Sequence, residues 1–282
     1  MRRTHSLTLL TLIAVVAAAT PAIARPLHWS DDQACATVFV VGVRGSGESR
    51  SADDEQRGFG TRAVVVLDAL EEQLSLIGVD VGAVSVEYPA IGIGDLARNL
   101  LDLDPPGYEQ SVDLGVEGLL TTIGLIRSRC PDSLTVIVGY SQGAEVVRRV
   151  LADPTLGEGD DIAAAIIIAD PQFEQSHSES GMQLRGSFAS RRFGIRNSMF
   201  TTTPAQWVAP RTFSVCNQSD IVCQFYLQRR LPAGAFNWSD GRAIHEGYDR
   251  LQLDPIVLTD VLPLVRERLD PYGWWRFGLL PG

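Results

Sequence analysis

The sequence predicts an α/β fold built on a parallel sheet. Short runs rich in Val, Ile and Ala alternate with longer stretches in which apolar residues recur at helical spacing. The short runs are almost continuously apolar, as strands covered on both faces are. Each run ends in a turn that contains Gly, Pro or Asp. Because strands and helices alternate throughout, a right-handed parallel sheet is the simplest arrangement.

Residues 1–24 have the pattern of a secretory signal peptide. Arg2 and Arg3 precede an apolar run from Leu9 to Ala19, which is too short for a comfortable membrane span. Ala22-Ile23-Ala24 is a small-x-small cleavage site. We therefore expect a secreted, extracellular protein whose residues 25–282 form a single domain with a C-terminal tail. An uncleaved anchor is the alternative, and both Sec and twin-arginine export fit the pattern.

The mature chain is strongly acidic. The full chain has 24 basic and 34 acidic residues, and removal of the two leader arginines leaves a net charge of −12. An acidic chain without a basic stripe is a poor candidate for binding nucleic acid. No stretch after the leader is long and apolar enough to span a membrane.

Two strands and two helices are expected before the centre of the chain. The strands lie at Thr37–Val43 and Val79–Tyr88, and the helices over 61–77 and 112–129. Gly78 ends the first helix, since glycine readily takes the left-handed conformation found at helix ends. Residues 90–110 contain several Gly and Pro residues and are expected to be mostly loop.

The second half repeats the alternation. Strands are expected at Val136–Val138, Ala163–Ala169 and Thr212–Val215, with a helix over 144–151 and a terminal amphipathic helix over 254–269. Asp170-Pro171 after the second of these strands is interpreted as an ordinary turn. Residues 172–210 are rich in Ser and Arg and are left unassigned, with His177 expected in solvent. The Trp274-Trp275 tail is expected to serve packing.

The most informative stretch is Gly139-Tyr140-Ser141-Gln142-Gly143. It is a Gly-x-Ser-x-Gly motif between a predicted strand and a predicted helix, the context in which that motif presents a nucleophilic serine. The two glycines lack the Cβ atoms that would clash at a sharp turn. The N–H of Gln142 would lie at a helix N-terminus, where an oxyanion is stabilised. A chance match in a loop is the alternative that this context disfavours.

A serine nucleophile needs a base, and the base needs an acid that orients it. Of the two histidines after Ser141, His245 has the better surroundings, and Asp220 lies in a tight turn after the last predicted strand. The order Ser141, Asp220, His245 is that of α/β-hydrolases. Ser46, after the first strand, is a candidate second oxyanion donor, although its glycine-rich loop alone favours an ordinary turn.

The cysteines are consistent with an oxidising compartment. Cys35, Cys130, Cys216 and Cys223 allow three pairings. The sequence has no Cys-x-x-Cys, and its four histidines are scattered, so no metal site is expected.

On these residues the chain resembles the cutinase family of secreted serine esterases. The matching pieces are Arg44-Gly45-Ser46, the Ser141 motif, Cys-x-x-x-Asp-x-x-Cys over 216–223, and His245 with Tyr248 three residues on. The resemblance spans roughly residues 35–250. It implies a three-layer, doubly wound α/β-hydrolase-like sandwich without a bulky lid.

The resemblance also implies the chemistry. Ser141 would be the nucleophile, His245 the base and Asp220 the orienting acid, with Ser46 and the Gln142 backbone as oxyanion hole. It implies disulfides Cys35–Cys130 and Cys216–Cys223, no cofactor and a monomer. Two departures are Gly47, where fungal members usually have threonine, and a longer 172–210 connection.

The sequence thus predicts a secreted esterase acting on cutin-like polyester or short-to-medium acyl esters. An acetylxylan esterase, whose substrate is an acylated polysaccharide, is the first alternative, because that relative shares the motifs. A non-catalytic surface protein that binds lipid or polymer is the second.

Overall fold

The computed structural model describes residues 34–51, 55–92, 107–175, 181–187, 194–196, 202–224 and 238–270. The predicted signal peptide, His177 and the Trp274-Trp275 tail lie outside these ranges. Among the described helices, none has the length and apolarity needed to cross a membrane.

Six parallel strands form one sheet, in the order β2-β1-β3-β4-β6-β5. The α/β fold with a parallel sheet is therefore confirmed. The four strands β1, β3, β4 and β6 are buried along almost their whole length, as their apolar sequences predict. The strands are β1 (Val38–Val43), β2 (Val81–Ser85), β3 (Leu134–Tyr140), β4 (Ile162–Ile168), β5 (Gln183–Gly186) and β6 (Thr212–Cys216).

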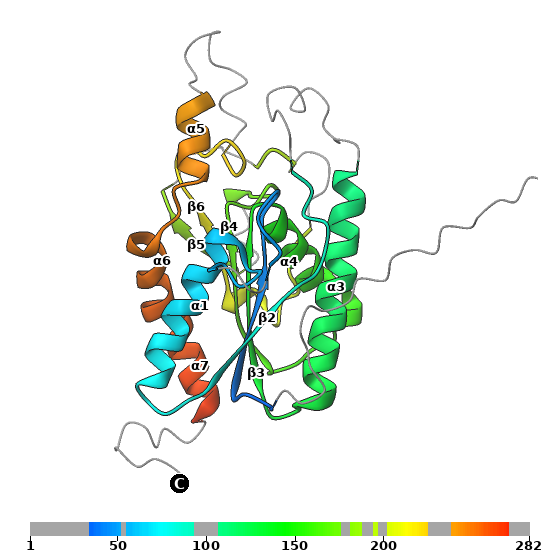
Figure 1. Ribbon diagram of the computed structural model, residues 1–282, viewed down its shortest axis with the longest axis vertical. Coiled ribbons are helices and arrows are strands. Elements are labelled where there is room, and N and C mark those ends of the chain that lie inside the picture. Colours follow the sequence, from blue (N-terminus) through cyan, green and yellow to red (C-terminus); the bar gives the residue numbers. More distant parts are fainter. Residues whose placement is uncertain are drawn as a thin grey trace, which may run out of the picture.

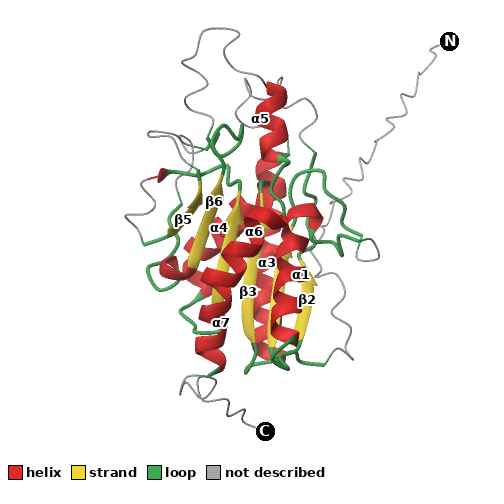
Figure 2. Ribbon diagram, turned by 90° about the vertical axis from the view of Figure 1, so that its left-hand side faces the viewer, coloured by secondary structure: helices red, strands yellow, loops and turns green. Residues whose placement is uncertain are grey.

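Helices cover both faces of the sheet (Figure 1). On one face lie α1 (Gly60–Ser75), α6 (Arg250–Ile256) and α7 (Leu262–Leu269), and on the other α3 (Tyr108–Arg129) and α4 (Gln142–Ala152). The short helix α5 (Trp238–His245) lies at one end of the molecule, beyond the sheet (Figure 2). Single 3₁₀ turns occur at η1 (Pro154–Leu156) and η3 (Ala209–Arg211).

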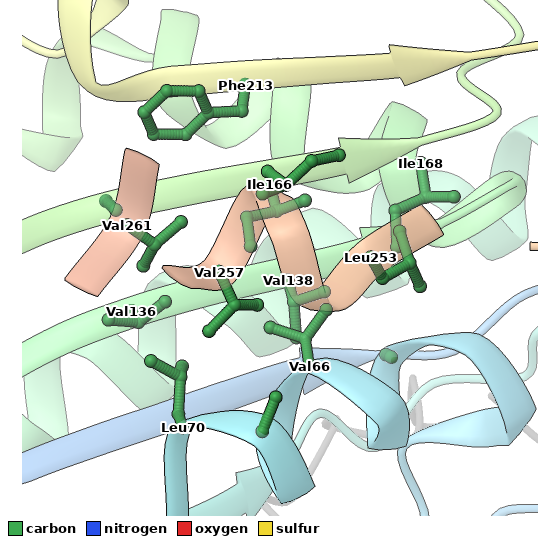
Figure 3. Close-up of a cluster of buried hydrophobic side chains, with 14 of the residues drawn as sticks. Val66, Leu70, Val136, Val138, Ile166, Ile168, Phe213, Leu253, Val257 and Val261 are labelled. Carbon is green, nitrogen blue, oxygen red and sulfur yellow. The ribbon is translucent and has the colours of Figure 1, made fainter. Parts of the chain in front are cut away.

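Two hydrophobic cores result, because successive strand residues point to opposite faces. Figure 3 shows the core in which α1 and the α6 region pack on β3, β4 and β6. The opposite core is formed by α3 and α4 against β1, β3 and β4. Side chains of the first core include Val66, Leu70, Val136, Val138, Ile166, Ile168, Phe213, Leu253, Val257 and Val261.

Three expected boundaries are corrected. Helix α3 begins at Tyr108 rather than Val112, because Tyr108 is buried and its hydroxyl donates to Glu145 (3.0 Å). The strand expected over 79–88 is shortened to β2, although Val86 N–H still donates to Gly42 O (2.9 Å). The terminal helix starts at Arg250, after the Asp249 cap, and includes a π-helical turn, η5 (Val257–Val261).

Two elements were not predicted at all. Strand β5 lies in the unassigned 172–210 connection and pairs with β6 at the edge of the sheet. Its sequence, Gln-Leu-Arg-Gly, has a single apolar side chain, so it lacks the pattern of a buried strand. Helix α5 has only 8 residues, and half of them are polar or charged.

The Cys35–Cys130 disulfide joins the residue stretch before β1 to the end of α3, with Cα atoms 5.5 Å apart. It closes a loop with a sequence separation of 95. In the chain-entropy model a disulfide that closes a loop of about 100 residues stabilises the folded protein by up to roughly 4.7 kcal/mol. This bond therefore acts on the stability of the whole sheet.

Candidate active site

Ser141 is the single residue between the end of β3 and the start of α4. Its backbone has φ 53° and ψ −117°, a conformation that costs a non-glycine residue about 1–3 kcal/mol. The turn is possible because Gly139 and Gly143 have no Cβ. A Cβ on Gly139 would collide with the carbonyl of Gly143, and one on Gly143 with the carbonyl of Val43. The sharp strand-to-helix turn expected from the motif is therefore present.

The three residues singled out in the sequence form one hydrogen-bonded chain. His245 Nε2 lies 3.1 Å from Ser141 Oγ, and His245 Nδ1 lies 3.0 Å from Asp220 Oδ2 and 3.1 Å from Oδ1. Ser141 follows β3, Asp220 follows β6, and His245 ends α5. The parallel sheet brings Ser141 and Asp220 together, because the carboxyl ends of its strands share one edge. Helix α5 then places His245 between them.

Asp220 is completely buried in the turn closed by the Cys216–Cys223 disulfide. Its Oδ1 accepts the N–H groups of Val222 (2.6 Å) and Cys223 (3.1 Å), and its Oδ2 accepts the hydroxyl of Tyr248 (2.8 Å). Burial by itself raises the pKa of this carboxyl, but the charge of His245 and these hydrogen bonds outweigh it. They hold the pKa of Asp220 below its ordinary value.

Tyr248 is the partner of Asp220 that sequence analysis left without a role. Its hydroxyl also accepts the N–H of Asn217 (2.9 Å). Burial, together with the nearby Asp220 charge, raises the pKa of Tyr248 well above its ordinary value, so the phenol stays protonated and donates.

Replacing Tyr248 with phenylalanine is expected to give a pH-dependent loss of stability. A carboxyl whose folded pKa is depressed stabilises the fold above its unfolded pKa of about 3.9, and this stability is lost as pH falls through the folded pKa. Without the phenol the folded pKa of Asp220 rises, so less stability is present at neutral pH. We expect a loss of about 1.5–3 kcal/mol near pH 7, the usual value of a hydrogen bond to a charged group.

The measurement is the free energy of unfolding by urea for both proteins from about pH 7 down to about pH 2, so that the range passes below the depressed pKa of Asp220. The difference in free energy of unfolding between the wild type and the variant should become smaller at low pH, where Asp220 takes up a proton. A gap that stays constant over this range would contradict the assigned cause of the pKa shift.

His245 is held by the residue that precedes Ser141. The Tyr140 ring stacks on the imidazole, with centroids 5.1 Å apart and planes 29° apart, and its hydroxyl donates to the His245 carbonyl (2.9 Å). Burial raises the pKa of Tyr140, so this donor also stays protonated. One strand end therefore positions both Ser141 and the histidine beside it.

Ser46 and Gln142 lie at the same edge of the sheet. Gln142 is the first residue of α4, and the first N–H groups of a helix have no acceptor within it. A Cβ on Gly143 would lie 2.6 Å from the carbonyl of Arg44, so the loop after β1 packs against the start of α4. The Ser46 hydroxyl is buried and has no hydrogen-bond partner among the residues that the structure describes.

Asp170 serves packing, in agreement with its interpretation as a turn residue. It is completely buried, forms an ion pair with the buried Arg148, and accepts the N–H of Gln172 (2.9 Å). Within the described part of the chain, no group of three or more His, Cys, Asp or Glu side chains is arranged to hold a metal ion.

A buried polar network beside the serine turn was missed from sequence. Glu145, one turn after Ser141, accepts hydrogen bonds from Tyr108 (3.0 Å), Gln172 (3.0 Å), Arg149 (2.6 Å) and Arg196 (3.2 Å). Gln172 and Arg196 belong to the 172–210 connection, which is thereby joined to α3 and α4. The residues of this network are separated by up to 88 positions in the sequence, so no local sequence pattern reveals them.

The chain is similar to several known proteins. A sequence profile described as Cutinase matches residues 34–233. The cutinase of Botryotinia fuckeliana is 27% identical over 210 residues, covering 72% of this chain and 77% of the relative. Acetylxylan esterase 2 of Talaromyces purpureogenus is 26% identical, covering 68% and 77%. Carboxylesterase Culp1 of Mycobacterium tuberculosis is 24% identical, covering 84% and 93%.

Solved structures share the fold. A crystal form of acetylxylan esterase matches with a TM-score of 0.56 at 22% identity, covering 84% of this chain and 100% of the other. A cutinase-like protein from Cryptococcus sp. matches with a TM-score of 0.56 at 16% identity, covering 81% and 95%. At these identities the likeness concerns the α/β-hydrolase-like fold.

Proposed function

The chain belongs to the cutinase family of serine carboxylic-ester hydrolases, and we propose that Ser141, His245 and Asp220 are its catalytic residues. The observation that carries this proposal is the continuous chain of hydrogen bonds from Ser141 Oγ through the imidazole to a buried carboxylate. Such a chain lets a serine hydroxyl lose its proton as it attacks a carbonyl.

The first half of the reaction forms an acyl-enzyme. Asp220 accepts a hydrogen bond from Nδ1–H of His245, so the proton stays on Nδ1 and the Nε2 lone pair faces the Ser141 hydroxyl. Ser141 Oγ attacks the ester carbonyl while Nε2 takes its proton. The imidazolium then gives this proton to the departing alcohol, and the ester C–O bond breaks.

The developing oxyanion would be bound by the N–H of Gln142 and by Ser46. The Gln142 N–H lies at the positive end of α4, and the Ser46 hydroxyl is a buried donor that no protein group occupies. Water then attacks the acyl-enzyme with His245 as base, releasing the acid and regenerating Ser141.

We propose carboxylic esters of cutin-like polyester, or short-to-medium acyl esters, as substrates. Among the relatives are the cutinase of Botryotinia fuckeliana and an acetylxylan esterase of Talaromyces purpureogenus, so acetylated xylan is the alternative substrate. The hydrogen-bonded trio argues against a protein that only binds lipid or polymer, since such a protein needs no aligned base. We also propose that the protein is exported and acts as an extracellular monomer, a setting that its two disulfides fit.

An ester panel tests the substrate proposal. Turnover of nitrophenyl esters from acetate to palmitate is measured beside release of acid from cutin and from acetylated xylan. We expect kcat/KM to be highest on short-to-medium chains, with release from cutin. Activity confined to acetate esters and acetylated xylan would support the alternative, and no turnover of any ester would support the binding protein.

A further inference from the structure

We infer that Glu48 is a positioning residue that holds Ser46 in place for the oxyanion. This inference rests on the proposed function and deepens it. The Arg44-Gly45-Ser46-Gly47-Glu48 turn follows β1, and sequence analysis gave a role only to its serine. The contacts of the other residues explain how that serine is fixed.

The Glu48 carboxylate links the Ser46 turn to the start of α1. Its Oε2 accepts the N–H of Gly45 (2.7 Å), directly before Ser46. Its Oε1 accepts both the N–H (2.9 Å) and the hydroxyl (2.6 Å) of Thr61, in the first turn of α1. The side chain is only 11% exposed, so water competes little for these bonds.

Two glycines make room for this carboxylate. A Cβ on Gly60, whose φ is 76°, would collide with Glu48 Oε2. A Cβ on Gly45 would lie 2.5 Å from the Tyr140 ring and 3.2 Å from the same oxygen. The backbone therefore approaches Glu48 from both sides: a side chain at Gly60 would displace the carboxylate, and one at Gly45 would collide with the Tyr140 ring and crowd the carboxylate.

The opposite side of the turn is held by Arg44 and by the backbone. Arg44 is buried and donates to the carbonyls of Val86 (3.2 Å), Tyr88 and Glu48 (3.2 Å). Gly47 N–H donates to the carbonyl of Ala90 (2.7 Å). Ser46 is thus fixed between bonded neighbours on each side, while its own hydroxyl has no partner.

An unpaired donor on a rigid turn is what stabilisation of a transition-state charge requires. Donors that are already in place cost no reorganisation when the oxyanion forms. If Glu48 is lost, Gly45 and Ser46 gain freedom, and a displacement of about 1 Å can cost roughly 10²-fold in rate. The loss should fall on kcat, because the oxyanion exists only in the transition state and the tetrahedral intermediate.

The test compares Glu48→Gln with Glu71→Gln on a soluble nitrophenyl ester. Glutamine keeps the shape of Glu48 but turns one oxygen into a donor, which then faces an N–H group. We expect kcat to fall about 10- to 100-fold with KM nearly unchanged. The control Glu71 lies on α1, the helix that Glu48 contacts, and pairs with Arg57 (2.7 Å), and its variant should keep kcat.

A double-mutant cycle separates positioning from a structural role. If Glu48 acts through Ser46, Glu48→Gln should cost less than about threefold once Ser46→Ala is present. A Glu48 that only caps α1 would lower the free energy of unfolding and leave kcat of the folded enzyme intact, which would overturn the inference. So would full additivity of the two changes.

A milder variant keeps the test decisive if Glu48→Gln does not fold. Thr61→Val removes one of the three hydrogen bonds to the carboxylate and should lower kcat about 2- to 5-fold, corresponding to one modest hydrogen bond. Unchanged kcat in this variant would overturn the inference. If the wild type lacks esterase activity, or Ser141→Ala retains it, the proposed function fails instead.

Discussion

Replacing Ser141 with alanine is expected to lower kcat on a soluble ester by roughly 10³-fold or more while the protein stays folded. His245 Nε2 lies 3.1 Å from this hydroxyl, and alanine offers no oxygen to acylate. The free energy of unfolding should change by no more than about 1 kcal/mol, because one modest hydrogen bond is lost. The strained φ of 53° persists in the variant.

Ser75→Ala is the matched control for this change. Ser75 lies at the exposed end of α1, and its hydroxyl donates to the carbonyl of Glu72 (2.9 Å) in the same helix. We expect its kcat to equal that of the wild type. Near-normal turnover by Ser141→Ala, measured on protein purified free of host esterases, would remove Ser141 from the mechanism.

Replacing Asp220 with asparagine is expected to lower kcat by roughly 10³- to 10⁴-fold with little change in KM. The asparagine carbonyl can still accept the N–H groups of Val222 and Cys223, so its amide NH₂ faces His245 Nδ1. The imidazole must then carry its proton on Nε2, where it donates toward Ser141 instead of accepting from it. The geometry survives, but the base holds its proton on the wrong nitrogen.

Stopped assays of kcat and KM, beside urea unfolding, measure this effect. Asp113→Asn is the control, since Asp113 is exposed and its carboxylate forms an ion pair with Arg149 (3.3 Å), away from His245. The Asp220 variant should remain folded, although it loses the charge that pairs with His245. If the variant retained more than about a tenth of wild-type kcat, its activity would be far above the expected residual activity, and Asp220 would not be the orienting acid.

The fold and the serine turn are predictable from sequence because their determinants are local. Gly139 and Gly143 flank Ser141, and the apolar runs of β3 and α4 lie on either side of the motif. The ends of parallel strands meet at one edge, so residues that follow β1, β3 and β6 were expected near one another. The structure has Ser46, Ser141 and Asp220 in those positions.

The supporting contacts are not predictable in this way. Tyr140 stacks on His245 across 105 positions, and Glu145 bonds to Arg196 across 51. Glu48 binds Gly45 nearby, but its second link is to Thr61 in the next helix. Such pairs leave no periodic signal, and short polar elements such as β5 and α5 lack the apolar pattern by which strands and helices are recognised.

Covalent labelling of the nucleophile tests the central claim most directly. The purified protein is incubated with an alkyl phosphonate ester, and residual esterase activity is followed beside intact mass and peptide mapping. We predict that activity disappears as one phosphonate is bound, that the modified residue is Ser141, and that Ser141→Ala binds none. Stoichiometric labelling of a different residue, or an active protein with a fully phosphonylated Ser141, would contradict the assignment.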